Sequence, residues 1–125
     1  MEHKLAKGQL LDQKGHLIEA GYAFSLVKTY QRQMIKAHPL RIKEWDYYYI
    51  GNHDMGVAIT VADNSYMGLI SMSFLDFKNQ TFTTTSKMLF LTKGKLKLPE
   101  SSKEGDIHVS KKDFEVHIVH QDKQR

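Results

Sequence analysis

The 125-residue sequence contains no cysteine, only two prolines and a single tryptophan. Without cysteine there is no disulfide framework, no thiolate nucleophile and no Cys-ligated metal site. The first 17 residues lack the apolar core of a signal peptide, and no apolar run approaches the roughly 18 residues that cross a bilayer. We therefore expect a single soluble domain spanning residues 1–125, located in the cytoplasm and without a membrane span.

Arginine is also scarce, although the formal net charge is +4. Only three arginines occur, and much of the positive excess is lysine between Lys93 and Lys112, interleaved with acidic residues. Nucleic-acid-binding proteins usually gather arginine and lysine on one face with aromatic residues between them. Here the aromatic residues lie elsewhere in the chain. The pattern favours a solvated, lysine-rich surface, and we expect no nucleic-acid partner.

Residues 1–40 form a lead-in to the rest of the chain. Apolar pairs at 10–11 and 17–18 flank Asp12–Gly15, which predicts a small hairpin with a tight turn. From Tyr22 to Ala37 apolar residues recur at helical spacing, and Pro39 ends the pattern. We expect one short helix here, centred on Gln31–Ala37.

The remainder reads as strands separated by turn signals at intervals of about ten residues, which indicates an antiparallel meander. The expected strands are Ile42–Ile50, Met55–Ala62, Tyr66–Phe77, Phe82–Leu91 and Asp113–Val119, with Ile107 and Val109 in a hairpin partner of the last. Asp63-Asn64 is interpreted as a turn rather than as a general base, since both residues tolerate left-handed backbone angles. The predicted fold class is mainly β: an antiparallel meander over residues 41–120 forming a partial β-barrel or sandwich, with one short N-terminal helix.

The candidate site lies in the strand that begins near Arg41. Strand alternation separates its side chains into two faces. The ligand-binding candidates share the first face and are Arg41, Lys43, Trp45, Tyr47 and Tyr49. The second face carries Ile42, Glu44, Asp46, Tyr48 and Ile50.

Two interpretations of this strand stay open. Burying a carboxylate costs several kcal/mol unless it is paired, so Glu44 and Asp46 would need partners such as Arg41 or Lys43 of neighbouring strands. Aromatic residues with a few polar groups are typical of a small-molecule cavity. The structural alternative is an aromatic core strand with charged ends.

No metal or cofactor site is predicted. The histidines lack the spacing of a zinc site, in which two histidines lie one helical turn apart with a third ligand. The glycines around Lys93 do not match a phosphate-binding loop, and neither a dinucleotide fingerprint nor a nucleophile elbow occurs. We therefore expect no metal and no cofactor.

Three stretches carry a family resemblance. They are GQLLDQKGHLIEAGYAFSLVKTYQRQMIKAHPLRIKEWDYYYIGN, VADNSYMGLISMSFLDF and LTKGKLKLPESSKEGDI. They resemble a bacterial family of unknown function, number 2804, and the most specific part is the segment from Arg41 to Tyr48. The family has no established activity. Its members are longer, so the resemblance implies that these residues form an N-terminal portion of a larger architecture.

The same family looks similar to the lipocalin-type β-barrels of the tocopherol cyclase and carotenoid hydratase group. That similarity implies binding of an apolar small molecule. A first alternative is lyase-, isomerase- or cyclase-like chemistry on a lipid-like substrate, with Asp46 or Glu44 as the acid and Tyr47 or Tyr49 stabilising charge. A second alternative is a truncated, non-catalytic fragment. Because a partial barrel leaves strand edges open, we expect a homo-oligomer that pairs those edges.

Overall fold

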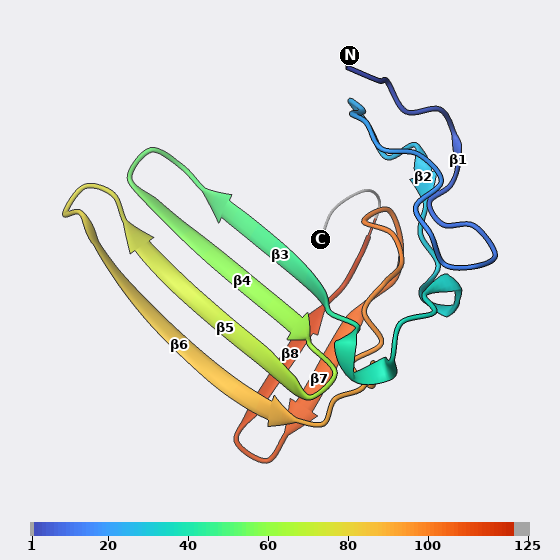
Figure 1. Cartoon of the computed structure of the whole chain (residues 1–125). Coiled ribbons are helices and arrows are strands. Elements are labelled where there is room, and N and C mark those ends of the chain that lie inside the picture. The colour runs from blue at the N-terminus through green and yellow to red at the C-terminus, as the bar shows by residue number, and fades with distance from the viewer. Residues whose placement is uncertain (1, 122–125) are drawn as a thin grey trace. The chain divides into compact units, whose positions relative to one another are not determined.

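The computed structural model describes residues 2–121, and its structure is mainly antiparallel β (Figure 1). The described chain divides into two compact units. One comprises residues 39–98, and the other comprises residues 2–38 together with 99–121.

The unit of residues 39–98 contains a four-stranded antiparallel sheet. Its strands are β3 (Glu44–Gly51), β4 (Met55–Asp63), β5 (Met67–Asp76) and β6 (Thr81–Phe90), and they lie side by side in chain order. The predicted meander is confirmed for these four strands, each within two residues of its expected bounds, but the last two strands form a separate two-stranded sheet. β3 and β6 are the edges, so the sheet is open and does not close into a barrel (Figure 1).

Short side chains at the turns fix the register of this sheet. In the β3–β4 turn, the side-chain oxygen of Asn52 accepts hydrogen bonds from the backbone N–H groups of Asp54 and Met55, at 2.8 and 3.0 Å. In the β5–β6 turn, Asp76 accepts from the backbone and side-chain nitrogens of Asn79, at 2.9 and 2.8 Å. These local bonds favour tight turns, and a tight turn sets which residues face each other across a hairpin.

The buried apolar residues of the sheet lie at one end only. Val61 and Ile70 are neighbours on one face, and Ala62 lies on the other, all three close to the β4–β5 connection. At the opposite end Met72 and Phe74 are about half exposed. Strand β5 lies inside the sheet, but it is not covered on both faces along its length.

In the second unit the predicted N-terminal hairpin is present. Leu11 and Leu17 form an antiparallel bridge, and the backbone N–H of Gly15 donates to the carbonyl of Asp12 at 3.0 Å. Gly15 has a φ of 81°, a left-handed conformation that glycine adopts without a steric penalty.

The helix predicted for the lead-in is reduced to a single 3-10 turn, η1 (Arg32–Met34), inside the expected range. The preceding residues are extended instead. β2 (Lys28–Thr29) pairs in parallel with β1 (Gly8–Gln9), and the N–H of Leu5 donates to the carbonyl of Tyr22 at 2.9 Å. Pairing with the first residues of the chain overrides the helical spacing, because propensity is weak beside tertiary contacts.

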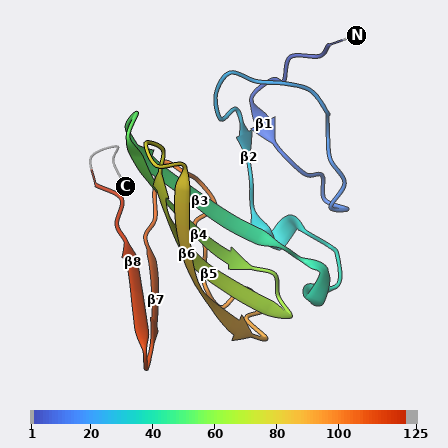
Figure 2. The ribbon, with the colours of Figure 1, turned by 90° about the vertical axis from the view of Figure 1, so that its left-hand side faces the viewer.

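The second unit also contains a separate antiparallel hairpin, formed by β7 (Ile107–Lys111) and β8 (Phe114–Ile118) (Figure 2). This is the pairing expected for the last two strands. Ile107 and Val109 are buried, and their neighbours His108 and Ser110 are exposed. The hairpin therefore has one buried and one exposed face, the usual alternation of an antiparallel pair. Among residues 2–121, no helix is long and apolar enough to cross a membrane.

Candidate functional site

Three aromatic residues of β3 form an exposed row on one face of the four-stranded sheet. Trp45, Tyr47 and Tyr49 are 64%, 60% and 49% exposed. Directly opposite them on β4 are Ala62, Thr60 and Ala58. Since directly paired residues point to the same side of an antiparallel sheet, the aromatic rings stand beside a row of small side chains.

We call this side of the sheet the aromatic face. The register of the four strands assigns to it Trp45, Tyr47 and Tyr49 of β3, Gly56, Ala58, Thr60 and Ala62 of β4, Leu69, Ser71, Ser73 and Leu75 of β5, and Phe82, Thr84, Ser86 and Met88 of β6. Small residues occupy the middle of the face, and larger apolar residues lie at its ends and along its edges.

Glycine at position 56 allows one of the aromatic rings to approach the backbone of β4 closely. A Cβ added to Gly56 would lie only 2.7 Å from the Tyr49 ring, so the ring rests where a side chain would otherwise stand. A large ring covering a strand glycine is a recognised way to stabilise such a position. Tyr49 therefore helps to build the aromatic face, whereas Trp45 and Tyr47 are free to contact another molecule.

The same face carries a group of hydroxyls beside the aromatic row. The hydroxyl oxygens of Ser73 and Thr84 lie 2.8 Å apart in a hydrogen bond between β5 and β6. Ser71 and Ser86 form the next cross-strand pair, and Thr60 is the neighbour of Ser71 on β4. The face thus offers apolar contact on one side and hydrogen-bonding groups on the other.

The two basic candidates lie outside the paired part of β3. Arg41 ends the 3-10 turn η2 (Pro39–Arg41), and Lys43 precedes the first paired residue, Glu44. Both side chains are exposed. Of the five ligand-binding candidates, the structure gathers the three aromatic residues on one face of the sheet.

The acid–base candidates are divided between the two faces. Glu44 and Asp46 lie on the face opposite to Tyr47, because they alternate with it along β3. The hydroxyl of Tyr48 donates a hydrogen bond to Asp46 at 2.9 Å. The structure therefore brings Asp46 together with Tyr48 and not with Tyr47.

Asp63 at the end of β4 is almost fully buried, with 1% of its surface exposed. One carboxylate oxygen accepts hydrogen bonds from the Thr92 hydroxyl at 2.6 Å and from the backbone N–H of Ser65 at 3.0 Å. The other oxygen accepts from the backbone N–H of Leu96 at 3.3 Å. The Ser65 hydroxyl in turn donates to the carbonyl of Ile42 at 2.7 Å.

These contacts give Asp63 a structural role. Burial raises the pKa of Asp63, but the hydrogen bonds from Thr92 and from the backbone outweigh burial and hold the pKa below its usual value. The carboxylate is thus charged, enclosed and engaged on both oxygens, and it joins the β4–β5 connection to the segment that follows β6. That arrangement supports the interpretation of Asp63-Asn64 as a turn.

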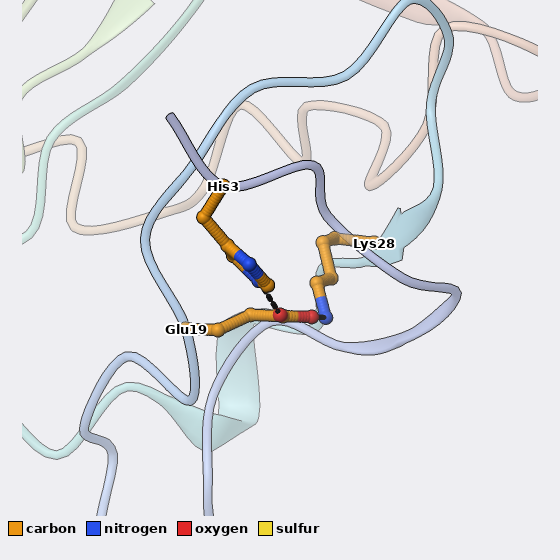
Figure 3. Close-up of polar contacts among 3 residues, drawn as sticks. All are labelled: His3, Glu19 and Lys28. Carbon is orange, nitrogen blue, oxygen red and sulfur yellow. Dashed lines mark hydrogen bonds and ion pairs between the residues drawn. The ribbon is translucent and has the colours of Figure 1, made fainter. Parts of the chain in front are cut away.

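A second polar cluster lies in the other unit, where the carboxylate of Glu19 contacts both His3 and Lys28 (Figure 3). One carboxylate oxygen of Glu19 contacts His3 Nε2 at 2.6 Å, and the other accepts a short hydrogen bond from the ammonium of Lys28. The hydrogen bonds from Lys28 and then from His3 lower the pKa of Glu19 from 4.5 to about 2. The cluster ties three separate segments of the lead-in together.

A half-open cavity of about 530 Å³ lies in the same unit, within the size range of small-molecule sites. Its lining is mostly polar: Leu26, Lys28, Thr29, Tyr30, Gln31, Glu100, Ser101, Ser102, Lys103 and Glu104. Sequence reasoning missed this cavity. Its two lining segments are about 70 residues apart in the chain, and neither contains a motif that signals their approach.

The open antiparallel sheet with its aromatic face defines the chain as a mainly β protein with an exposed, mixed apolar and hydroxyl surface. A family model described as "Domain of unknown function (DUF2804)" matches residues 2–125. The chain therefore belongs to that family, as the resemblance of its sequence indicated. No curated protein and no solved structure matches it significantly.

Proposed function

We propose that the chain binds an apolar small molecule on the aromatic face of the sheet formed by β3–β6. The observation that carries this proposal is the exposure of Trp45 and Tyr47 side by side above a row of small residues. A contiguous patch of exposed apolar rings often marks a binding site. A ligand ring could stack on Trp45 and Tyr47 and approach the backbone closely over Ala58 and Thr60.

The chemistry of the face indicates the class of ligand. The aromatic row suits an apolar ring or chain, and the hydroxyls of Ser73 and Thr84 suit one hydroxyl or carbonyl group at its end. Small-molecule sites usually combine a mainly apolar lining with a few polar groups that fix orientation. The ligand class is therefore a lipid-like molecule with one polar group.

An open sheet encloses a ligand on one side only, and a second wall is needed to bury most of its surface. We propose that another copy of the chain supplies it, by pairing through the edge strands β3 or β6. Two four-stranded sheets joined in this way provide eight strands. About eight strands is the number that closes into a lipocalin-like barrel able to hold one small ligand. We also propose that the protein is located in the cytoplasm.

Acid–base chemistry on a lipid-like substrate is the alternative function, and it would use the opposite face of β3. The specific observation is the hydrogen bond from Tyr48 to Asp46, a carboxylate with a phenol at contact distance. Loss of turnover without loss of binding in Asp46→Asn would favour this alternative over simple binding.

Trp45 supplies a direct test, because it is the only tryptophan of the chain. We would titrate the protein with retinol, an apolar ring and polyene with one hydroxyl that absorbs where tryptophan emits. Binding on the aromatic face should quench Trp45 emission in a saturable way. Tyr47→Ala should weaken binding about tenfold, which corresponds to about 1.4 kcal/mol of lost ring contact.

The matched control is Tyr66→Ala. Tyr66 is 49% exposed, comparable to the aromatic row, but it lies in the β4–β5 connection. This variant should bind retinol like the wild type. Equal weakening in both variants, or quenching that never saturates, would contradict a site on the aromatic face.

A further inference from the structure

The exposed face of the β7–β8 hairpin carries two histidines directly opposite each other. His108 on β7 pairs with His117 on β8, and their ring centroids are 5.0 Å apart with the planes tilted by 42°. Both lie on the side away from the buried residues Ile107 and Val109. The two imidazoles are therefore close together and open to solvent, on the outer face of a two-stranded hairpin.

This separation matches the geometry of two imidazoles that share one metal ion. Zinc binds histidine nitrogens at about 2.0–2.1 Å in a tetrahedral arrangement, which places two ring centres about 5 Å apart. Little movement of the backbone is needed, because directly opposed residues of an antiparallel pair already point to the same side at short distance.

A carboxylate already orients one of the rings. The Nε2 atom of His108 lies 2.7 Å from a carboxylate oxygen of Glu115, two residues before His117 on β8. Metal-binding histidines usually donate the N–H of their second nitrogen to such a carboxylate, which fixes the tautomer and raises the basicity of the ligating nitrogen. In the tautomer in which Nε2–H donates to Glu115, the lone pair of His108 is on Nδ1 and can bind a metal ion.

We propose that His108 and His117 form a binding site for one divalent transition metal ion such as Zn²⁺, with Glu115 as the residue that positions His108. Within residues 2–121 no group of three His, Cys, Asp or Glu side chains is arranged to hold a metal. The two imidazoles therefore act as the protein ligands, and water completes the coordination. The site belongs to the other unit of the chain and is independent of the aromatic face.

The test is calorimetric titration of the full chain with zinc chloride at neutral pH. The wild type should bind one ion per chain, and saturable binding should be lost in both His108→Thr and His117→Thr, since threonine keeps a good strand propensity. Glu115→Gln should still bind zinc, with affinity reduced about 10- to 100-fold, the usual cost of removing such a carboxylate. In NMR spectra the rings of His108 and His117 should shift together at the first equivalent.

The matched control is His53→Thr. His53 lies 3.3 Å from Asp54, so it is also an exposed histidine with a carboxylate neighbour, but it lies in the β3–β4 turn. This variant should bind zinc like the wild type. The absence of saturable zinc binding, or binding unchanged in His117→Thr, would overturn the proposal and leave the pair as a surface stack of two rings.

Discussion

The two units of the chain are held together in different ways. In residues 39–98, three consecutive antiparallel ladders join β3 to β6, and each ladder links segments that are adjacent in sequence. The other unit contains the five-residue β7–β8 ladder, but in its lead-in the strands β1 and β2 are only two residues long, and Glu19 adds side-chain contacts to His3 and Lys28. The sheet is thus stabilised mainly by long backbone ladders, whereas the lead-in combines scattered backbone hydrogen bonds with the side-chain contacts of Glu19.

The largest loss of stability is expected on removal of Asp63, the buried carboxylate at the end of β4. Asp63→Ala leaves the Thr92 hydroxyl and the backbone N–H groups of Ser65 and Leu96 without their acceptor. Buried groups left unpaired cost about 1–3 kcal/mol each, so the free energy of unfolding should fall by about 3 kcal/mol. Urea unfolding followed by Trp45 fluorescence measures this change.

Asp76→Ala is the matched control for that experiment. Asp76 also accepts two hydrogen bonds at a turn, but both come from Asn79 and are exposed. Water can replace them, so the expected loss is about 1 kcal/mol or less. Equal losses in the two variants would show that Asp63 is no more important than an ordinary turn residue.

Two buried glycines of the sheet should respond differently to the same added methyl group. In Gly68→Ala the new Cβ would lie 2.7 Å from Thr92 Cγ2, and Thr92 is held by Asp63. Overpacking of this kind costs about 1–3 kcal/mol. In Gly56→Ala the Cβ meets the Tyr49 ring, the far end of a side chain at an exposed edge.

The ring of Tyr49 can turn away, so Gly56→Ala should destabilise the protein less than Gly68→Ala does. Moving the ring also changes the aromatic face, and retinol binding should weaken in Gly56→Ala while Gly68→Ala leaves it unchanged. Thermal unfolding and the retinol titration together measure both differences. A larger loss of stability in Gly56→Ala would contradict the packing described for Thr92.

Acid should loosen the lead-in through Glu19. Its pKa is about 2 in the folded chain and 4.5 without its partners, so the folded state binds fewer protons. The stabilisation is complete above pH 4.5 and is lost as the pH falls from 4.5 towards 2. Hydrogen exchange at the amides of Leu5 and Gly8, which bond to the Tyr22 and Val27 carbonyls, reports this loss.

Glu19→Gln should remove most of that pH dependence and leave those amides less protected at neutral pH. Glu115→Gln is the control, because Glu115 also contacts a histidine but lies on the β7–β8 hairpin. It should leave the exchange of Leu5 and Gly8 unchanged. If protection at these amides were the same in Glu19→Gln as in the wild type, the cluster would not hold the lead-in.

The strands of the sheet could be predicted from the sequence more fully than the structure of the lead-in could. The strands from Glu44 to Phe90 followed from alternation and turn residues, since each pairs with its neighbour in the chain. The short helix expected near Gln31–Ala37 is reduced to Arg32–Met34, and the pairing of the preceding residues with the start of the chain leaves no trace in local spacing.

How well each candidate site could be predicted also depends on whether its residues are related by strand alternation or by approach in space. Alternation along β3 placed Trp45, Tyr47 and Tyr49 on one face, and the register of the sheet agrees. The contact of Lys28 with Glu19 and the closeness of His108 to His117 depend on approach in space. The closeness of His108 to His117 could have been found from the expected hairpin, by pairing its strands residue by residue across the turn.

Native mass spectrometry of the chain as purified from cells, followed by extraction with an organic solvent, tests whether the protein is an oligomer that carries a ligand. Our account predicts an oligomer that carries a lipid-like molecule with one polar group, and the loss of that molecule in Tyr47→Ala but not in Tyr66→Ala. A stable, monodisperse monomer with no extractable molecule would contradict both the ligand on the aromatic face and the pairing of the sheet edges.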